Sequence, residues 1–115
     1  MIQKGNIEKL TNQNTYYRKV ISTTPQQQLV LMCLKPLEEI GMEKHPHTTQ
    51  FIRVESGRGK AVVGKSTYRL SDDSFIIIPP NKCHNIINTS KTKPLKLYTI
   101  YSPPEHKPGT KQKRK

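Results

Sequence analysis

Three histidines and a glutamine carry the side chains best suited to binding a metal ion. His45 and His47 are separated by one residue, and Gln50 follows three residues later. On an extended segment, alternate side chains point to the same side, so the two imidazoles are predicted to face one point. After a short turn, the carboxamide oxygen of Gln50 is expected to return to that point, and His84 is expected to supply a fourth ligand.

This donor set predicts one divalent ion, which could be Zn, Mn, Fe or Ni. Gln50 either binds the ion directly or hydrogen-bonds to a ligand histidine or to a bound water. A glutamine oxygen carries no charge. Three imidazoles and a neutral oxygen are therefore expected to bind the ion more weakly than a set with a carboxylate, and to leave it a stronger Lewis acid.

Short apolar runs rich in β-branched residues fill the centre of the chain, and turn-forming residues separate them at intervals of about ten residues. A hairpin is expected at Gly64-Lys65, and further turns are expected at Asp72-Asp73 and at Asn81. No stretch predicts a helix convincingly. The eight or so strands are expected in residues 16–23, 29–34, 51–55, 60–63, 66–70, 74–78, 84–88 and 94–102. This spacing predicts an all-β fold, either an antiparallel barrel or a jelly roll.

With 115 residues the chain is expected to form one domain with one hydrophobic core. Residues 16–104 are predicted to form the β-barrel domain, and residues 1–15 a polar arm that could pack onto a partner chain. Residues 105–115 have no apolar side chain to bury, so they are expected to be a disordered basic tail or a strap along the surface. His106, within this tail, is expected to face solvent.

The formal net charge is +12, and the tail after Pro104 contributes five bases against one acid, Glu105. A basic surface suits nucleic acid, an acidic partner or a small phosphorylated substrate. No zinc-finger spacing, RNA-recognition aromatic motif or phosphate-binding glycine loop accompanies the charge, so nucleic acid is disfavoured as a partner. No long apolar run or secretory leader is present either, which predicts no membrane partner and a cytoplasmic location.

The two histidine segments resemble the two sequence motifs of the small single-domain cupins. The first family motif has a glycine, His-x-His, an acid three or four residues on and another glycine; it is matched by Gly41, His45, His47, Gln50 and Gly57. Gly41 lies about two residues closer to the histidines than the family pattern has it. The second motif is matched, with every spacing kept, by Asp73, Pro79, Asn81, His84 and Asn88.

Three substitutions distinguish the chain from these motifs. Gln50 replaces the usual acid, whereas Asp73 and Asn81 replace turn glycines, whose left-handed backbone Asp and Asn tolerate. Asn88 is expected to be structural and to tie a turn to the second motif. The segments QFIRVESGRG and KLYTIYSPPEH are similar to short bacterial and viral cupins often described as mannose-6-phosphate isomerase-like. The resemblance covers about residues 29–104 and implies a cupin barrel with one metal ion.

The resemblance also implies an aldose-ketose isomerase that acts on a small sugar or sugar phosphate, with the ion stabilising an enediolate. Glu43 and Tyr101 are candidates for the catalytic base, and Arg53 and Lys82 for binding a phosphate. Two alternatives remain open: a non-catalytic module that binds a sugar, an anion or a protein, and oxygen chemistry on iron, which usually requires a carboxylate ligand. The exposed sheet edges of a small barrel predict a homodimer.

Overall fold

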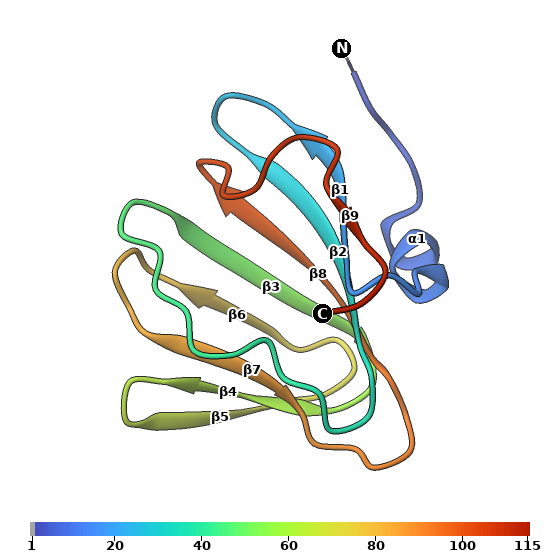
Figure 1. The fold of residues 1–115 in the computed structure, drawn as a ribbon, viewed down its shortest axis with the longest axis vertical. Coiled ribbons are helices and arrows are strands. Elements are labelled where there is room, and N and C mark those ends of the chain that lie inside the picture. Colours follow the sequence, from blue (N-terminus) through green and yellow to red (C-terminus); the bar gives the residue numbers. More distant parts are fainter. Residues whose placement is uncertain (1) are drawn as a thin grey trace.

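The computed structural model describes residues 2–115 as two antiparallel β-sheets that face each other, with one short helix beside them (Figure 1). The strands are β1 (Arg18–Thr23), β2 (Gln28–Leu34), β3 (Thr49–Ser56), β4 (Gly59–Val63), β5 (Ser66–Leu70), β6 (Phe75–Ile78), β7 (His84–Asn88), β8 (Leu95–Ser102) and β9 (Lys111–Gln112). The larger sheet has the order β6-β3-β8-β2-β1-β9, and the smaller sheet has the order β5-β4-β7. This arrangement confirms the predicted all-β jelly roll.

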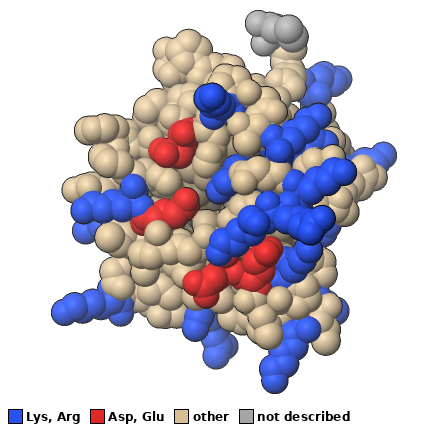
Figure 2. All heavy atoms as spheres, viewed as in Figure 1, with Lys and Arg blue, Asp and Glu red and all other residues tan. Residues whose placement is uncertain are grey.

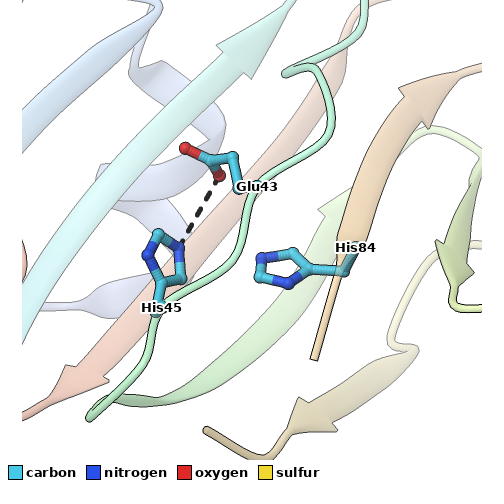
Figure 3. Close-up of side chains that lie close together, drawn as sticks. All are labelled: Glu43, His45 and His84. Carbon is cyan, nitrogen blue, oxygen red and sulfur yellow. Dashed lines mark ion pairs between the residues drawn. The ribbon is translucent and has the colours of Figure 1, made fainter. Parts of the chain in front are cut away.

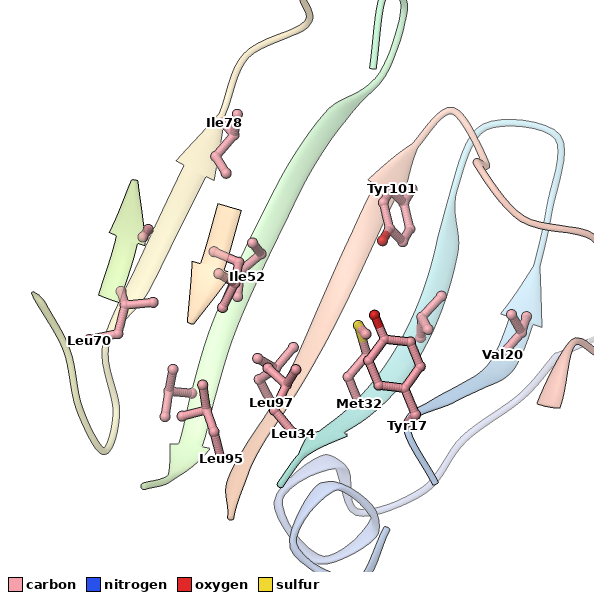
Figure 4. Packing of buried hydrophobic residues seen from close by; sticks show 14 residues of the cluster. Tyr17, Val20, Met32, Leu34, Ile52, Leu70, Ile78, Leu95, Leu97 and Tyr101 are labelled. Carbon is pink, nitrogen blue, oxygen red and sulfur yellow. The ribbon is translucent and has the colours of Figure 1, made fainter. Parts of the chain in front are cut away.

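The hydrophobic core fills the space between the two sheets (Figure 4). Strand β8 shows why these residues form it: Leu95, Leu97, Thr99 and Tyr101 are buried, and the residues between them are only half-buried. Successive side chains of a strand point to opposite faces, so this alternation supplies one apolar face. The neighbouring strands of the larger sheet and the smaller sheet add Val20, Val30, Met32, Leu34, Ile52, Val54, Ala61, Leu70, Ile78 and Ile86.

The turns expected from the sequence are present. Gly64 and Lys65 connect β4 to β5 as a two-residue hairpin turn, since Val63 pairs with Ser66. Asp73 and Asn81 both adopt left-handed backbone, with φ of 70° and 68°. The two residues that replace motif glycines therefore take up the conformation that glycine would supply there.

The N-terminal arm contains one helix that the sequence did not predict, α1 (Ile7–Gln13). The side chain of Asn6 caps it by accepting a hydrogen bond from the Lys9 N–H at 2.9 Å. The helix packs against β2, β3 and β8 of the same chain. It has seven residues, and no helix in residues 2–115 is long and apolar enough to cross a membrane.

Of the two forms expected for residues 105–115, the structure shows the surface strap, which we call the C-terminal strap. The backbone N–H groups of Glu105 and His106 donate to Gln28 Oε1 at 3.2 and 3.0 Å, and β9 pairs with β1. His106 is half-buried, with its ring edge-on to the ring of Tyr101 at a centroid distance of 5.1 Å. The expectation that His106 faces solvent is therefore wrong, because Gln28 holds its backbone against the barrel.

Candidate metal centre

The inner face of the larger sheet becomes polar at the end where β2 begins and β8 ends. Gln28, Tyr101 and Gln50 are direct neighbours on β2, β8 and β3, and all three are buried. Deeper in the barrel the equivalent neighbours are apolar, as in the pair of Met32 and Leu97. We call Gln28, Tyr101 and Gln50 the polar row. Buried polar groups of this kind require hydrogen-bond partners or a ligand.

Glu43 and His84 face each other across a short antiparallel bridge. The Glu43 N–H donates to the His84 carbonyl at 2.7 Å, and the His84 N–H donates to the Glu43 carbonyl at 2.8 Å. Residues paired in this way carry their side chains on the same face. His45 lies two residues beyond Glu43, so its side chain points to that face as well. The connection between β2 and β3 thus carries Glu43 and His45, and β7 carries His84.

Glu43, His45 and His84 form a group that could hold a metal ion (Figure 3). Each offers one ligand atom, and these atoms all lie within 4.8 Å of one another. His45 Nε2 is 3.8 Å from Glu43 Oε1, and the two imidazole centroids are 5.2 Å apart. Both histidines are buried and Glu43 is half-buried, so the group opens to the surface on the side of the carboxylate.

A polar neighbour lies at the Nδ1 atom of each imidazole. His84 Nδ1 lies 2.8 Å from the carbonyl oxygen of Lys82, which can only accept, so Nδ1 carries the proton and Nε2 presents its lone pair. His45 Nδ1 lies 3.3 Å from a carboxylate oxygen of Glu105, which favours the same tautomer. Each ring therefore directs an acceptor nitrogen towards the group.

Three buried acceptor atoms in this region have no hydrogen-bond partner: His45 Nε2, His84 Nε2 and Gln50 Oε1. The amide nitrogen of Gln50 donates to Thr99 Oγ1 at 3.0 Å, which leaves its carboxamide oxygen unpaired. Burying unpaired acceptors costs free energy, whereas one divalent cation satisfies nitrogen and oxygen ligands together. The residues present therefore fit a metal ion.

The structure does not bring His47 to this group. Pro46 and His47 form a turn, and His47 is exposed on it. The ring of Pro46 fixes its own φ and keeps the preceding residue extended, so the extended segment ends at His45 and the chain then reverses. Alternation does place two potential ligands on one side, but the pair is Glu43 and His45.

This geometry shifts the first cupin motif by two residues. With Glu43 and His45 in the His-x-His positions, the motif glycine falls on Leu37, which adopts left-handed backbone with φ of 64°. A branched side chain rarely takes up that conformation, which is typical of glycine. In the new register Gln50 lies five residues after the second motif position, one more than the motif spacing, whereas Gly57 keeps its distance from Gln50. The sequence signal for this pair is the alternation of Glu43 and His45 on the extended segment that ends at Pro46.

The two residues expected to bind a phosphate are not brought to the group. Arg53 alternates along β3 with the inward-facing Ile52 and Val54, and it pairs with Asp73 at 3.0 Å and Glu55 at 3.4 Å. It thus lies on the outer face of the larger sheet. Lys82 is exposed in the turn before β7, and it takes part only through the backbone carbonyl that accepts from His84.

Both residues named as candidate bases lie at the group, and the structure distinguishes their roles. Glu43 stands among the potential ligands, where it supplies the negative charge that Gln50 lacks. Tyr101 is buried, and its ring contacts that of His45 at a centroid distance of 5.8 Å. Burial, and then the negative charge of Glu43, raise the pKa of the Tyr101 hydroxyl well above its ordinary value. At neutral pH this hydroxyl is a hydrogen-bond donor and not a base.

Three residues near the group lie outside the sites predicted from the sequence. Glu105 and His106 come from the C-terminal strap. Burial lowers the pKa of the His106 imidazole to about 4, and the positive charge of Arg18 adds to this effect. Arg18, on β1, donates to Gln112 Oε1 at 2.6 Å, and no carboxylate in the described part of the chain pairs with it. Arg18 lies two residues from the buried Val20 on the same strand, and this spacing is the sequence signal that its side chain faces the inside of the barrel.

Comparisons with known sequences agree with this architecture. The chain is 50% identical over 107 residues to the uncharacterized protein L612 of Acanthamoeba polyphaga mimivirus, covering 90% of this chain and 67% of that protein. It is 46% identical over 111 residues to the uncharacterized protein YrkC of Bacillus subtilis, covering 91% and 59%. It is 36% identical over 69 residues to the mannose-1-phosphate guanylyltransferase RfbM of Salmonella typhimurium, covering 60% and 14%. The chain therefore spans about two thirds of the first relative and less of the other two.

A crystal structure of the protein BH2720 from Bacillus halodurans has the same fold. It superposes with a TM-score of 0.96 at 39% sequence identity, and the match covers 99% of this chain and 90% of that one. A family model described as a cupin domain matches residues 30–101, which contain the larger part of both sheets and the three residues of the metal group. On this match and this fold, the chain belongs to the cupin family.

Proposed function

We propose that the protein is a metal-dependent enzyme of the aldose-ketose isomerase kind, acting on a small sugar or sugar phosphate. Glu43, His45 and His84 would hold one divalent ion, with Gln50 Oε1 as a fourth ligand. The observation that carries the metal site is the set of three buried acceptor atoms, on His45, His84 and Gln50, that lack a hydrogen-bond partner. The sugar-phosphate class is supported by the sequence similarity to a mannose-1-phosphate guanylyltransferase.

A bound divalent ion would supply Lewis acidity towards the carbonyl and the neighbouring hydroxyl of such a substrate. The protein contributes the surroundings of the reacting atoms. Tyr101 stays protonated and can donate a hydrogen bond to a substrate oxygen. Arg18, which lacks a carboxylate partner among the described residues, is suited to binding a phosphate and takes the role that the sequence assigned to Arg53 and Lys82.

Elemental analysis of the purified protein tests the metal site. We expect about one divalent ion per chain, and we expect His45→Ala and His84→Ala to lose it, because each removes a buried nitrogen ligand. The matched control is His47→Ala, which removes an exposed imidazole and should retain the ion. Full metal retention in His84→Ala, or metal loss in His47→Ala, would contradict the proposed ligand set.

Turnover of mannose-6-phosphate, followed by NMR before and after chelation, tests the activity. We expect turnover that chelation abolishes. Glu43→Gln separates two roles of this carboxylate: loss of the ion indicates a ligand, whereas a retained ion without turnover indicates the base. Bound sugar phosphate without turnover in the metal-loaded wild type would instead identify a non-catalytic binding module.

One observation favours oxygen chemistry on iron as a second candidate function. Glu43 completes a set of two histidines and one carboxylate, which is the ligand type of many non-haem iron oxygenases. The sequence interpretation disfavoured this chemistry because Gln50 carries no charge, and Glu43 removes that objection. Iron in the purified protein together with substrate-dependent oxygen uptake would support this candidate over the isomerase.

A further inference from the structure

The C-terminal strap reaches the candidate metal centre through one side chain. A carboxylate oxygen of Glu105 lies 3.3 Å from His45 Nδ1, on the opposite side of the ring from Nε2, which faces Glu43. Glu105 has no other ion-pair partner in residues 2–115. His45 is buried, and of the two carboxylates beside its ring Glu105 is the nearer, since Glu43 Oε1 lies 3.8 Å from Nε2.

The position of Glu105 is fixed by a backbone clamp. Gln28, which is fully buried in the polar row, accepts from the N–H groups of Glu105 and His106 through Oε1. Its amide nitrogen donates to the carbonyl of His106 at 2.7 Å and to Thr23 Oγ1 at 3.0 Å. A buried glutamine with both ends of its carboxamide satisfied in this way holds the strap in one register.

The rest of the strap reinforces this register. His106 packs edge-on against Tyr101, with its Nε2 3.4 Å from the tyrosine hydroxyl. Further along, Gln112 Oε1 accepts from Arg18, and β9 extends the larger sheet beside β1. Three independent anchors thus hold eight residues that carry no apolar side chain to bury.

We infer that the C-terminal strap is part of the metal centre and that Glu105 is a positioning residue for His45. Glu105 accepts the Nδ1 proton, so that Nε2 keeps its lone pair for the ion, and it fixes the orientation of the ring. Carboxylates that hydrogen-bond to a ligand histidine also raise its basicity. This inference rests on the proposed metal site, which it extends from the two sequence motifs to a third segment of the chain.

Titration of the metal-free protein with Co²⁺ tests the inference, with affinity and the visible absorption spectrum as readouts. We expect Glu105→Ala to lower Co²⁺ affinity by about 10- to 100-fold and to alter the spectrum, as is typical for partners of ligand histidines. Glu105→Gln keeps an acceptor oxygen without the charge and should lose less. Lys107→Ala in the same strap and Glu8→Gln on α1 are matched controls that should behave as wild type.

The His45 tautomer gives a readout that needs no metal. Long-range ¹H–¹⁵N NMR of the metal-free protein should show the Nδ1–H form in wild type and a tautomer mixture in Glu105→Ala. Gln28→Met removes the hydrogen bonds that hold the strap but keeps Glu105. In this variant too, the His45 tautomer should shift from the Nδ1–H form to a mixture. If Glu105→Ala had the Co²⁺ affinity, the spectrum and the His45 tautomer of the wild type, the inference would be overturned. If His84→Ala nevertheless lost the ion, the proposed metal site would stand. Failure of wild type to bind any divalent ion would overturn both.

Discussion

Residue 50 sets the charge of the candidate ligand group. With neutral imidazoles and a glutamine, Glu43 provides the only negative charge among Glu43, His45, His84 and Gln50. The hydrogen bond from Gln50 Nε2 to Thr99 fixes which end of the carboxamide remains unpaired. Position 50 thus supplies an oriented oxygen that carries no charge. Substitution by Glu keeps an oxygen at this position and adds the charge, so it tests the effect of the charge alone.

We expect Gln50→Glu to bind Zn²⁺ at least about tenfold more tightly than wild type, a gain of about 1.4 kcal/mol. The added carboxylate attracts the ion at close range, and Thr99 Oγ1 can donate to the carboxylate in place of accepting from the amide. Competition titration with a chelator of known affinity measures the change. Gln26→Glu makes the same charge change at an exposed position, and equal affinities for the two variants would contradict this role of Gln50.

His106 predicts a pH dependence of stability. Its folded pKa is lowered to about 4 by burial and by the charge of Arg18, whereas an exposed histidine titrates near 6.5. Between these values the unfolded chain binds more protons, so the free energy of unfolding should fall as pH falls from about 6.5 to about 4. Urea denaturation of the metal-free protein at several pH values measures this slope. His106→Gln should have a shallower slope, and parallel curves for both proteins would disprove the assignment.

Part of the candidate metal site could be predicted from the sequence, and the part that was missed has a local physical cause. His45, His84 and Gln50 were proposed from side-chain chemistry and spacing; the structure brings the two histidines together with Glu43 and leaves the buried carboxamide oxygen of Gln50 without a partner. Alternation was applied to His45 and His47, although Pro46 ends the extended segment between them. Glu43 was named as a base because a carboxylate in a sequence does not show whether an ion or a proton is its partner.

At the scale of elements, strand and turn positions could be predicted because their causes are local. β-Branched runs and alternation gave the eight longer strands, and the left-handed Asp73 and Asn81 follow from their side-chain chemistry. Helix α1 depends on the Asn6 cap and on packing against three distant strands, neither of which a seven-residue pattern reveals. The strap depends on hydrogen bonds to Gln28 and β1, so its polar composition resembled that of a disordered tail.

Asn88 joins elements and provides a stability prediction at this scale. Fully buried, its Nδ2 donates to the carbonyls of Leu34, Lys35 and Lys93, and its Oδ1 accepts from the Ser90 N–H. Asn88→Ala removes these four hydrogen bonds and leaves a cavity at a fully buried position, so we expect it to lower the free energy of unfolding by about 3 kcal/mol. Chemical denaturation measures the loss. Gln26→Ala, at an exposed position, should change stability by less than about 0.5 kcal/mol, and a similar small effect at Asn88 would refute its structural role.

At the scale of the whole molecule, basic side chains are spread widely over the surface, whereas exposed apolar side chains include a pair on one edge strand. Basic side chains are spread over much of the face in Figure 2, with acidic side chains among them near its centre. The exposed apolar residues include Phe75 and Ile77 of β6, which forms one edge of the larger sheet, and Phe75 stacks on Phe51 with centroids 5.8 Å apart. An exposed edge with apolar side chains is a surface suited to association.

We therefore expect a homodimer formed through β6. Light scattering on the eluted protein should give twice the chain mass of 13.2 kDa. Phe75→Glu combined with Ile77→Glu should give the monomer, because two carboxylates on this edge would be buried without partners. Tyr68→Glu changes an exposed apolar residue on β5 and serves as the control. A monomeric wild type would disprove the expectation.

The ligands of the proposed site come from both layers of the sandwich: His84 lies on β7 of the smaller sheet, whereas Gln50 lies on β3 of the larger one. A cation held between them would cross-link the two sheets at this end of the sandwich, whereas buried aliphatic side chains such as Leu95 and Leu97 pack in the core. Stripping the cation should then accelerate amide hydrogen exchange in residues 39–45 and 84–88 and leave the opposite end protected.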